Sequence, residues 1–159
     1  MTDYFLDASA AVKRYADEPG STWIRGITES QARNTILLAE ISLAEVAAAL
    51  AAKQRAAKGI SLEQRNRVLS RFLQDCQDHF VLLSVDRSVI DRAVELTQRH
   101  RLRAYDAVQL ATALDASAIM QSQTLPALTF VAADSDLLTA AAAERLSVEN
   151  PLKYTHLDS

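Results

Sequence analysis

Cysteine is almost absent from this sequence of 159 residues, and glycine and proline are scarce. The single cysteine, Cys76, excludes an intrachain disulfide and a thiolate zinc cluster, and it is expected to be a small buried side chain. With three glycines and three prolines, the composition indicates no disordered tail, no fibrous repeat and no linker. We therefore expect one domain that covers residues 1–159.

Long apolar runs are missing as well. No stretch reaches the roughly 18 uninterrupted apolar residues that a membrane-spanning helix needs. Residues 1–7 lack the basic segment and the apolar stretch of a secretory leader. The expectation is a soluble, cytoplasmic protein that makes no membrane contact.

An excess of positive charge and a cluster of histidines are also missing. Lys and Arg number 17 against 20 Asp and Glu, which gives a net charge of −3. Non-specific binding of nucleic acid relies on many cationic contacts to phosphate, so any such contact must be local. His79, His100 and His156 do not have the spacing of a metal site, and we expect them at the surface.

The sequence does contain short apolar runs that alternate with helical patterns. Strands are predicted at residues 4–6, 35–39, 80–85 and 128–132, with a short edge strand within 147–152. Helices are predicted at residues 8–15, 41–59, from 61 onward, from 86 or 88 to 96, 105–120 and 134–146. This alternation predicts an α/β fold with a central, mostly parallel sheet flanked by helices.

Two aspartates lie where predicted strands end. Asp7 closes the first strand, and Asp134 follows the last long one. Open α/β sheets place their ligand sites at the carboxyl ends of strands, so these two side chains are expected in one cleft. Each could equally be a helix cap, because an aspartate at a helix start accepts backbone N–H bonds and complements the helix dipole.

Glu45 and Asp106 have the same two interpretations. The segment Ser42-Leu43-Ala44-Glu45 reads as a capping box, in which Glu45 reaches back to the cap. Asp106 lies in the first turn of a predicted helix, where acids are common, and Asp136 is equally ambiguous. Spacing along the chain does not show whether the four carboxylates meet.

If they do meet, a divalent cation is physically required. Four carboxylates in one cleft repel each other or take up protons unless a cation neutralises them. Carboxylate oxygens are the ligands that Mg²⁺ prefers, and bound Mg²⁺ leaves room for water. An ion in this setting activates water and stabilises charge on a phosphate, which is the chemistry of phosphodiester hydrolysis.

Four blocks of the chain resemble those of VapC-type PIN-domain toxins. They are residues 4–15 with the trailing Glu18-Pro19-Gly20-Ser21, residues 41–46, residues 102–113 with their Tyr-Asp-Ala segment, and residues 130–137. Their order and spacing fit the family over nearly the whole chain. The resemblance implies a PIN-like three-layer fold.

The resemblance also implies a function. It implies an endoribonuclease dependent on Mg²⁺ or Mn²⁺, a homodimer, and neutralisation by a cognate VapB-like antitoxin inserted into the active-site groove. The catalytic residues that it implies are Asp7, Glu45, Asp106 and Asp134, of which Asp7, Asp106 and Asp134 would bind the metal. One departure is Ala132, where the family commonly has Thr or Ser. The supporting hydroxyl is therefore absent, or it comes from Ser9 or Ser135.

Substrate contacts have several candidates beside the carboxylates. Ser9 could bond a metal-bound water or simply satisfy the first helical turn. Lys13 and Arg14 follow Asp7, and Arg101 and Arg103 precede Asp106, so these cations could contact RNA phosphate locally. Most residues of this kind are solvated surface.

Two other functions are compatible with the sequence. A Mg²⁺-dependent phosphatase would use Asp7 as its nucleophile, but it would usually carry a second aspartate where this chain has Ser9. A non-catalytic PIN scaffold would bind RNA or a partner with an inactive site, a possibility that Ala132 leaves open. Absence of metal binding would support the scaffold.

Overall fold

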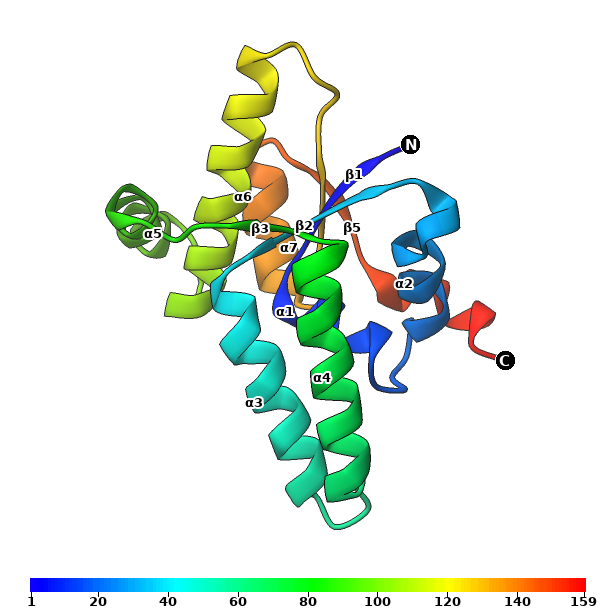
Figure 1. The fold of residues 1–159 in the computed structure, drawn as a ribbon. Helices are drawn as coiled ribbons and strands as arrows, with labels where there is room; N and C mark the ends of the chain where they lie inside the picture. The colour runs from blue at the N-terminus through cyan, green and yellow to red at the C-terminus, as the bar shows by residue number, and fades with distance from the viewer.

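A computed structural model describes residues 1–159 and shows a five-stranded sheet at their centre (Figure 1). The strands are β1 (Asp3–Leu6), β2 (Thr35–Ala39), β3 (Val81–Leu83), β4 (Thr129–Val131) and β5 (Ser147–Glu149). Their order across the sheet is β3-β2-β1-β4-β5, and every neighbouring pair is parallel. The predicted α/β fold is confirmed, with a sheet that is parallel throughout.

Helices connect the strands and cover both faces of the sheet (Figure 1). The α-helices are α1 (Ala8–Ala11), α2 (Ser21–Thr28), α3 (Ile41–Arg55), α4 (Leu62–Asp78), α5 (Arg87–Arg99), α6 (Ala104–Ser122) and α7 (Ser135–Ala143). Three 3₁₀ helices are η1 (Val12–Arg14), η2 (Ser30–Ala32) and η3 (Pro151–Leu157). None of the helices combines the length and the apolar composition that crossing a bilayer requires.

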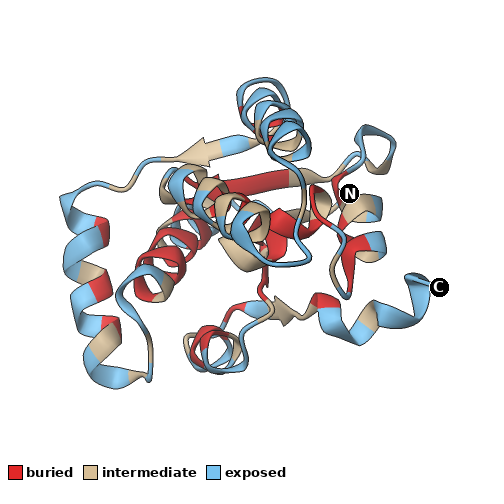
Figure 2. Cartoon of the chain, turned by 90° about the horizontal axis from the view of Figure 1, so that it is seen from below, coloured by how far each residue is buried: buried red, intermediate tan, exposed pale blue.

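Alternation along the strands builds the three layers. Phe5 and Phe130 point into one core with α5, α6 and α7, where their rings stack 5.5 Å apart. Leu6 and Val131, the next residue on each strand, point into the other core with α1 to α4. Figure 2 shows the buried residues gathered in the middle of the molecule and the exposed ones around the periphery. Burial on both faces explains why these strands read as continuous apolar runs.

Some predicted boundaries are wrong. The helix expected at 8–15 is a single α-helical turn that tightens into η1, and the helix expected to reach residue 59 ends at Arg55. The edge strand expected within 147–152 is only β5, because Pro151 begins η3. The helix α2 was not predicted at all. Its start at Gly20, which has a φ of 86°, reads in the sequence as a turn.

The predicted capping box is also wrong. Ser42 lies inside α3, which begins at Ile41 and has no side-chain cap. The residues that form a capping box are Ser61 and Gln64, at the start of α4. Ser42 and Glu45 are therefore free to make other contacts.

The sheet has a topological switch point between β1 and β4. The chain runs from β1 outward to β3, and then returns to the other side of β1 for β4 and β5. Connections on the two sides of this point leave a crevice beyond the carboxyl ends of β1 and β4, which is where α/β sheets bind ligands. Asp7 directly follows β1 at this crevice, and its backbone N–H donates to the Val131 carbonyl of β4 at 3.0 Å.

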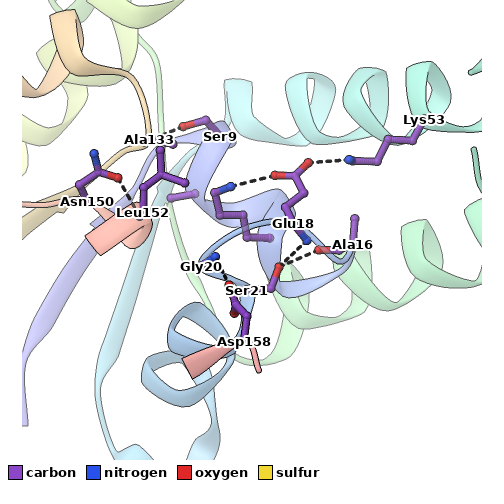
Figure 3. Close-up of polar contacts among 12 residues, drawn as sticks. Ser9, Ala16, Glu18, Gly20, Ser21, Lys53, Ala133, Asn150, Leu152 and Asp158 are labelled. Carbon is purple, nitrogen blue, oxygen red and sulfur yellow. Dashed lines mark hydrogen bonds and ion pairs between the residues drawn. The ribbon is translucent and has the colours of Figure 1, made fainter. Parts of the chain in front are cut away.

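The last residues of the chain pack against α2 on the other side of the molecule. The Tyr154 ring stacks on Trp23 with centroids 4.5 Å apart. The Asp158 carboxylate accepts the backbone N–H of Gly20 at 2.6 Å (Figure 3). It also accepts the backbone N–H of Thr22 at 3.0 Å. A Cβ added at Gly20 would lie 2.5 Å from the Pro151 carbonyl oxygen. Only glycine therefore fits at this position.

Candidate functional site

Asp7 is the deepest carboxylate at the switch point. It is 4% exposed and caps α1, with Oδ1 accepting the Ala10 N–H at 2.9 Å. Burial raises its pKa to about 7, against hydrogen bonds from Ser9 and Ala10 that lower it, and the charges of Asp106 and Glu45 raise it further. The capping role is compatible with a role in a site, because the second carboxylate oxygen, Oδ2, accepts no backbone hydrogen bond.

Ser9 connects Asp7 with the loop after β4. Its hydroxyl lies 2.7 Å from Oδ1 and 2.9 Å from Oδ2 of Asp7, and its oxygen accepts the Ala133 N–H at 3.1 Å (Figure 3). The side chain at Ala132 is fully buried, so the position where a hydroxyl was missing faces the core. In this chain Ser9 supplies the hydroxyl between the two strand ends.

Asp134 and Asp106 form the more open side of the site. Asp134 caps α7 through a 2.8 Å bond from the Leu137 N–H to Oδ1, and the residue is exposed. Asp106 lies in the first turn of α6 and is half-buried. Burial and the charge of Asp134 raise the pKa of Asp106, while Arg103 lowers it. These two carboxylates are therefore close enough to repel each other.

Glu45 reaches the site from α3 and is held there by α6. Its Oε2 accepts a 2.6 Å hydrogen bond from Nε2 of Gln109, which also donates to Ser42 Oγ at 2.9 Å. Burial raises the pKa of Glu45, the Gln109 bond lowers it, and the charge of Asp106 raises it. Gln109 is 1% exposed, and its Oε1 is the single buried side-chain polar atom without a partner.

The structure thus brings together the four carboxylates that the sequence singled out. Asp7 is influenced by Glu45 and Asp106, and Asp106 by Asp134. Asp136 stands at the outer edge, half of its side chain exposed, 3.8 Å from Arg101. The carboxylates come from the starts of α1, α3, α6 and α7, all at the carboxyl edge of the sheet.

The donor set fits a hydrated divalent cation. No three of these side chains approach closely enough to hold one ion together in the observed arrangement. Mg²⁺ usually keeps several waters and binds through one or two carboxylates, so it does not need three direct protein ligands. Raised pKa values at Asp7, Glu45 and Asp106 show carboxylates crowded by burial and by each other, which a cation would relieve.

Lys13 and Arg14, which were expected to contact RNA phosphate, both have partners within the protein. Lys13 is buried, and its Nζ lies 3.0 Å from Oε2 of Glu18. Arg14 donates from Nε to Asp75 at 3.1 Å and from Nη1 to Thr28 at 2.7 Å. Both cations are thus engaged within the protein, which argues against a contact with phosphate.

Arg103 is placed differently from these two cations. It is exposed, directly precedes α6 and makes no hydrogen bond or ion pair through its side chain. The positive charge of Arg103 acts on Asp106, because it lowers the pKa of that carboxyl group. Arg103 therefore remains a candidate for substrate contact.

Sequence reasoning missed Gln109 and Glu18. Gln109 lies within the helical block at residues 102–113, but its partners are 64 and 67 residues away. Glu18 accepts bonds from both Lys13 and Lys53, the latter at 2.6 Å (Figure 3). A buried glutamine on an otherwise apolar helix face is the one sequence signal that could have indicated the first of these roles.

Comparisons with known proteins agree with this arrangement. Three solved structures have a similar fold: FitAB bound to a DNA fragment, VapBC2 of Rickettsia felis bound to a DNA fragment from its promoter, and VapC20 of Mycobacterium tuberculosis, a Sarcin-Ricin loop cleaving toxin. Their TM-scores are 0.62, 0.60 and 0.59, at identities of 19%, 17% and 15%. The matches cover 94%, 94% and 90% of this chain and 95%, 98% and 95% of those chains, respectively. At identities this low, the structural matches establish a shared fold and nothing more.

The family itself is established from the sequence. No curated protein matches the chain. The sequence profile of the PIN domain, however, matches residues 4–144, a range that contains Asp7, Glu45, Asp106 and Asp134. The chain therefore belongs to the PIN domain family.

Proposed function

We propose that this protein is a Mg²⁺-dependent endoribonuclease toxin, similar to VapC, that hydrolyses RNA phosphodiester bonds. The observation that carries the proposal is the convergence of four carboxylates at the switch point, where Asp7 is buried with a pKa near 7. Burial of like charges beside one another is unfavourable unless a cation neutralises them, and carboxylates with raised pKa values that meet in a cleft are typical of functional sites. Mn²⁺ would substitute for Mg²⁺ at the same oxygen ligands.

Each residue has a distinct part in this proposal. Asp7, Asp106 and Asp134 would hold the cation, in part through its bound waters, and Glu45, fixed by Gln109, would orient the attacking water or accept its proton. Ser9 keeps Asp7 oriented toward the cleft and tied to the Ala133 backbone. When bound, Mg²⁺ supplies activated water and neutralises charge that develops on the phosphate. Arg103 would contact a substrate phosphate beside Asp106.

The experiment combines purified protein with structured RNA and Mg²⁺ or Mn²⁺. Its controls are EDTA, Asp7→Asn, and the matched variant Asp91→Asn, which removes an exposed carboxylate on α5 that is paired with Arg87. Cleavage by the wild type and by Asp91→Asn, but not by Asp7→Asn or with EDTA, is the expected result. Cation binding without any cleavage would contradict the nuclease function, and absence of both would favour the non-catalytic scaffold.

We further propose that a small VapB-like antitoxin neutralises the protein and that the protein forms a homodimer. Support for the antitoxin comes from the FitAB and VapBC2 structures, in which proteins of similar fold are bound to DNA fragments, and the homodimer is what the resemblance to VapC-type toxins implies. Co-expression with the product of a neighbouring small gene should yield a complex without nuclease activity. Light scattering on the free protein should give twice the monomer mass of 17.4 kDa.

A further inference from the structure

A polar cavity of about 350 Å³ opens beside the carboxylates. Asp106, Asp134 and Asp136 line one side of it, at the starts of α6 and α7. The other side is the end of α5 and its connection to α6, with His100, Arg101 and Arg103. The cavity therefore extends from the proposed cation site to a positively charged wall.

The two arginines of this wall are free to bind a ligand. Arg101 has one ion partner, Asp136, at 3.8 Å, and its side chain is 93% exposed. An exposed pair at this distance contributes little and is readily exchanged. Arg103 has no hydrogen-bond or ion-pair partner for its side chain. Two guanidinium groups thus line one cavity without a strong partner in the protein.

The backbone that carries these arginines is held in place. Nε2 of His100 lies 2.7 Å from Oε1 of Glu144 on the turn after α7, and the His100 side chain is only 17% exposed. Leu102, between the arginines, packs against the core formed with α5, α6 and α7. The segment is therefore fixed from both sides, which reduces the entropy lost when the arginines bind a ligand.

The lining of the cavity selects the chemistry of its ligand. Leu102 is the single hydrophobic residue in it, so an apolar ligand or an apolar peptide segment does not fit. Guanidinium groups bind phosphate oxygens in a bidentate manner. A ligand that extends from the carboxylates to the arginines would present one phosphate at the cation site and another at the wall, as an RNA strand does.

We propose that this cavity binds the RNA phosphate next to the one that is cleaved, with Arg101 and Arg103 as its ligands. The inference rests on the proposed nuclease function and adds a defined subsite to it. His100 and Leu102 keep the two arginines on the cleft side. Binding at this subsite sets which phosphodiester bond lies over the carboxylates.

The test uses an RNA decamer that spans a cleavage site mapped with the wild-type protein and Mg²⁺. In two further decamers, an uncharged methylphosphonate replaces the phosphate on the 5′ or on the 3′ side of the cleaved bond. Dissociation constants are measured by fluorescence anisotropy with Ca²⁺ in place of Mg²⁺, and a gel verifies that the RNA stays intact. The proteins are the wild type, Arg101→Gln/Arg103→Gln, and the control Arg67→Gln/Arg87→Gln, which removes two exposed arginines on α4 and α5.

We expect one methylphosphonate position to weaken binding by the wild type and by the control about tenfold. The Arg101→Gln/Arg103→Gln variant should bind the unmodified decamer about tenfold more weakly and should be insensitive to the replacement, since interacting partners give non-additive effects. The slope of log affinity against log salt should become shallower by about one for this variant, because the contact to one phosphate is lost.

Two results would overturn the inference, and they are distinguishable. If the wild type cleaves RNA but the arginine variant binds as tightly as the wild type, or remains equally sensitive to the methylphosphonate, the subsite is absent while the nuclease function stands. If the wild type cleaves no RNA, the proposed function fails and the subsite fails with it.

Discussion

At the scale of single residues, Asp7 shows how one side chain can be both a helix cap and a buried member of a cluster of acids. Its Oδ1 satisfies the Ala10 N–H, as any N-cap aspartate would, yet the residue is almost fully buried among other acids. A cap alone does not require this burial, because most caps lie at the surface. The consequence is a carboxylate whose charge is destabilising unless something neutralises it.

This conflict predicts a pH dependence of stability. The pKa of Asp7 rises from 3.8 to about 7, so between these values the folded protein binds a proton that the unfolded chain has released. Stability therefore falls as the pH rises through this range, by up to about 4 kcal/mol above pH 7. Asp7→Asn removes the charge and retains an acceptor for the Ala10 N–H.

Thermal unfolding in EDTA, followed by circular dichroism, checks this prediction. The wild type and Asp7→Asn should unfold at similar temperatures at pH 5, and the variant should unfold at a clearly higher temperature at pH 8. Mg²⁺ should raise the midpoint of the wild type at pH 8 and leave that of the variant nearly unchanged. Equal midpoints at both pH values would mean that the Asp7 charge is stabilised by other groups.

Gln109 provides a second prediction at this scale. Gln109→Met keeps the length of the side chain and removes the N–H donors to Glu45 and Ser42. Because Glu45 loses its orienting bond, RNA cleavage should fall about tenfold or more while KM changes little. Ser42→Ala, which leaves the Glu45 bond intact, should cleave near the wild-type rate. An equal loss in both variants would assign the effect to the packing of α3 against α6.

The contrast between these residues shows what sequence reasoning can reach. Asp7 and Asp134 could be predicted because each directly follows a strand, so the sheet itself determines where they lie. The intramolecular pairing of Lys13 and Arg14 could not, because it depends on specific partners: Glu18, and Asp75, which is 61 residues from Arg14. A side chain's availability depends on contacts that are distant along the chain.

At the scale of elements, partly buried ion pairs connect η1 with α3. Glu18 lies between Lys13 of η1 and Lys53 near the end of α3, at 3.0 and 2.6 Å. Burial raises the pKa of Glu18, but hydrogen bonds and charge from the two lysines outweigh it and lower the pKa overall. Its contribution to stability is thus present at neutral pH and is lost as the pH falls through this lowered pKa.

Glu18→Gln tests this link between elements. The substitution leaves the buried Lys13 ammonium without a counter-charge, so the free energy of unfolding should fall by about 2 kcal/mol. Denaturant unfolding at pH 7 measures this change. Glu63→Gln, which breaks an exposed pair with Arg67 on α4, is the matched control and should have little effect. A similar small effect in both variants would mean that Lys13 finds solvent or another partner.

Element prediction succeeded where local chemistry decides the structure. Strands β1, β2 and β4 were predicted because they are short, apolar and bounded by polar residues. Helix α2 was missed because Pro19 and Gly20 look like a loop, and its eight residues are stabilised by η3, from the other end of the chain. Tertiary packing, rather than the propensity of its own residues, is what makes this segment helical.

At the scale of the whole molecule, the C-terminal helix η3 packs against α2, which lies in the first third of the chain. Tyr154→Ala removes the ring that stacks on Trp23, so the protein should be destabilised by about 1 to 2 kcal/mol. RNA cleavage should be unaffected at temperatures well below unfolding, because η3 does not contribute to the carboxylate site. Thermal unfolding and a cleavage assay on the same samples check both parts. The control Leu157→Ala, in the same segment, should be milder, and a cleavage defect in Tyr154→Ala would connect η3 to the site.

The order of the strands has a consequence for how the protein is synthesised. β1 is the first strand to leave the ribosome, yet it lies at the centre of the sheet, and its neighbour β4 is made after more than 120 further residues. Until then, one side of β1 has no partner, and Asp7 lies apart from Asp106 and Asp134. The nascent chain is therefore exposed to wrong strand pairing for most of its synthesis. The carboxylate cluster is among the last features to form, so the nuclease proposed above would become active only when synthesis is nearly complete.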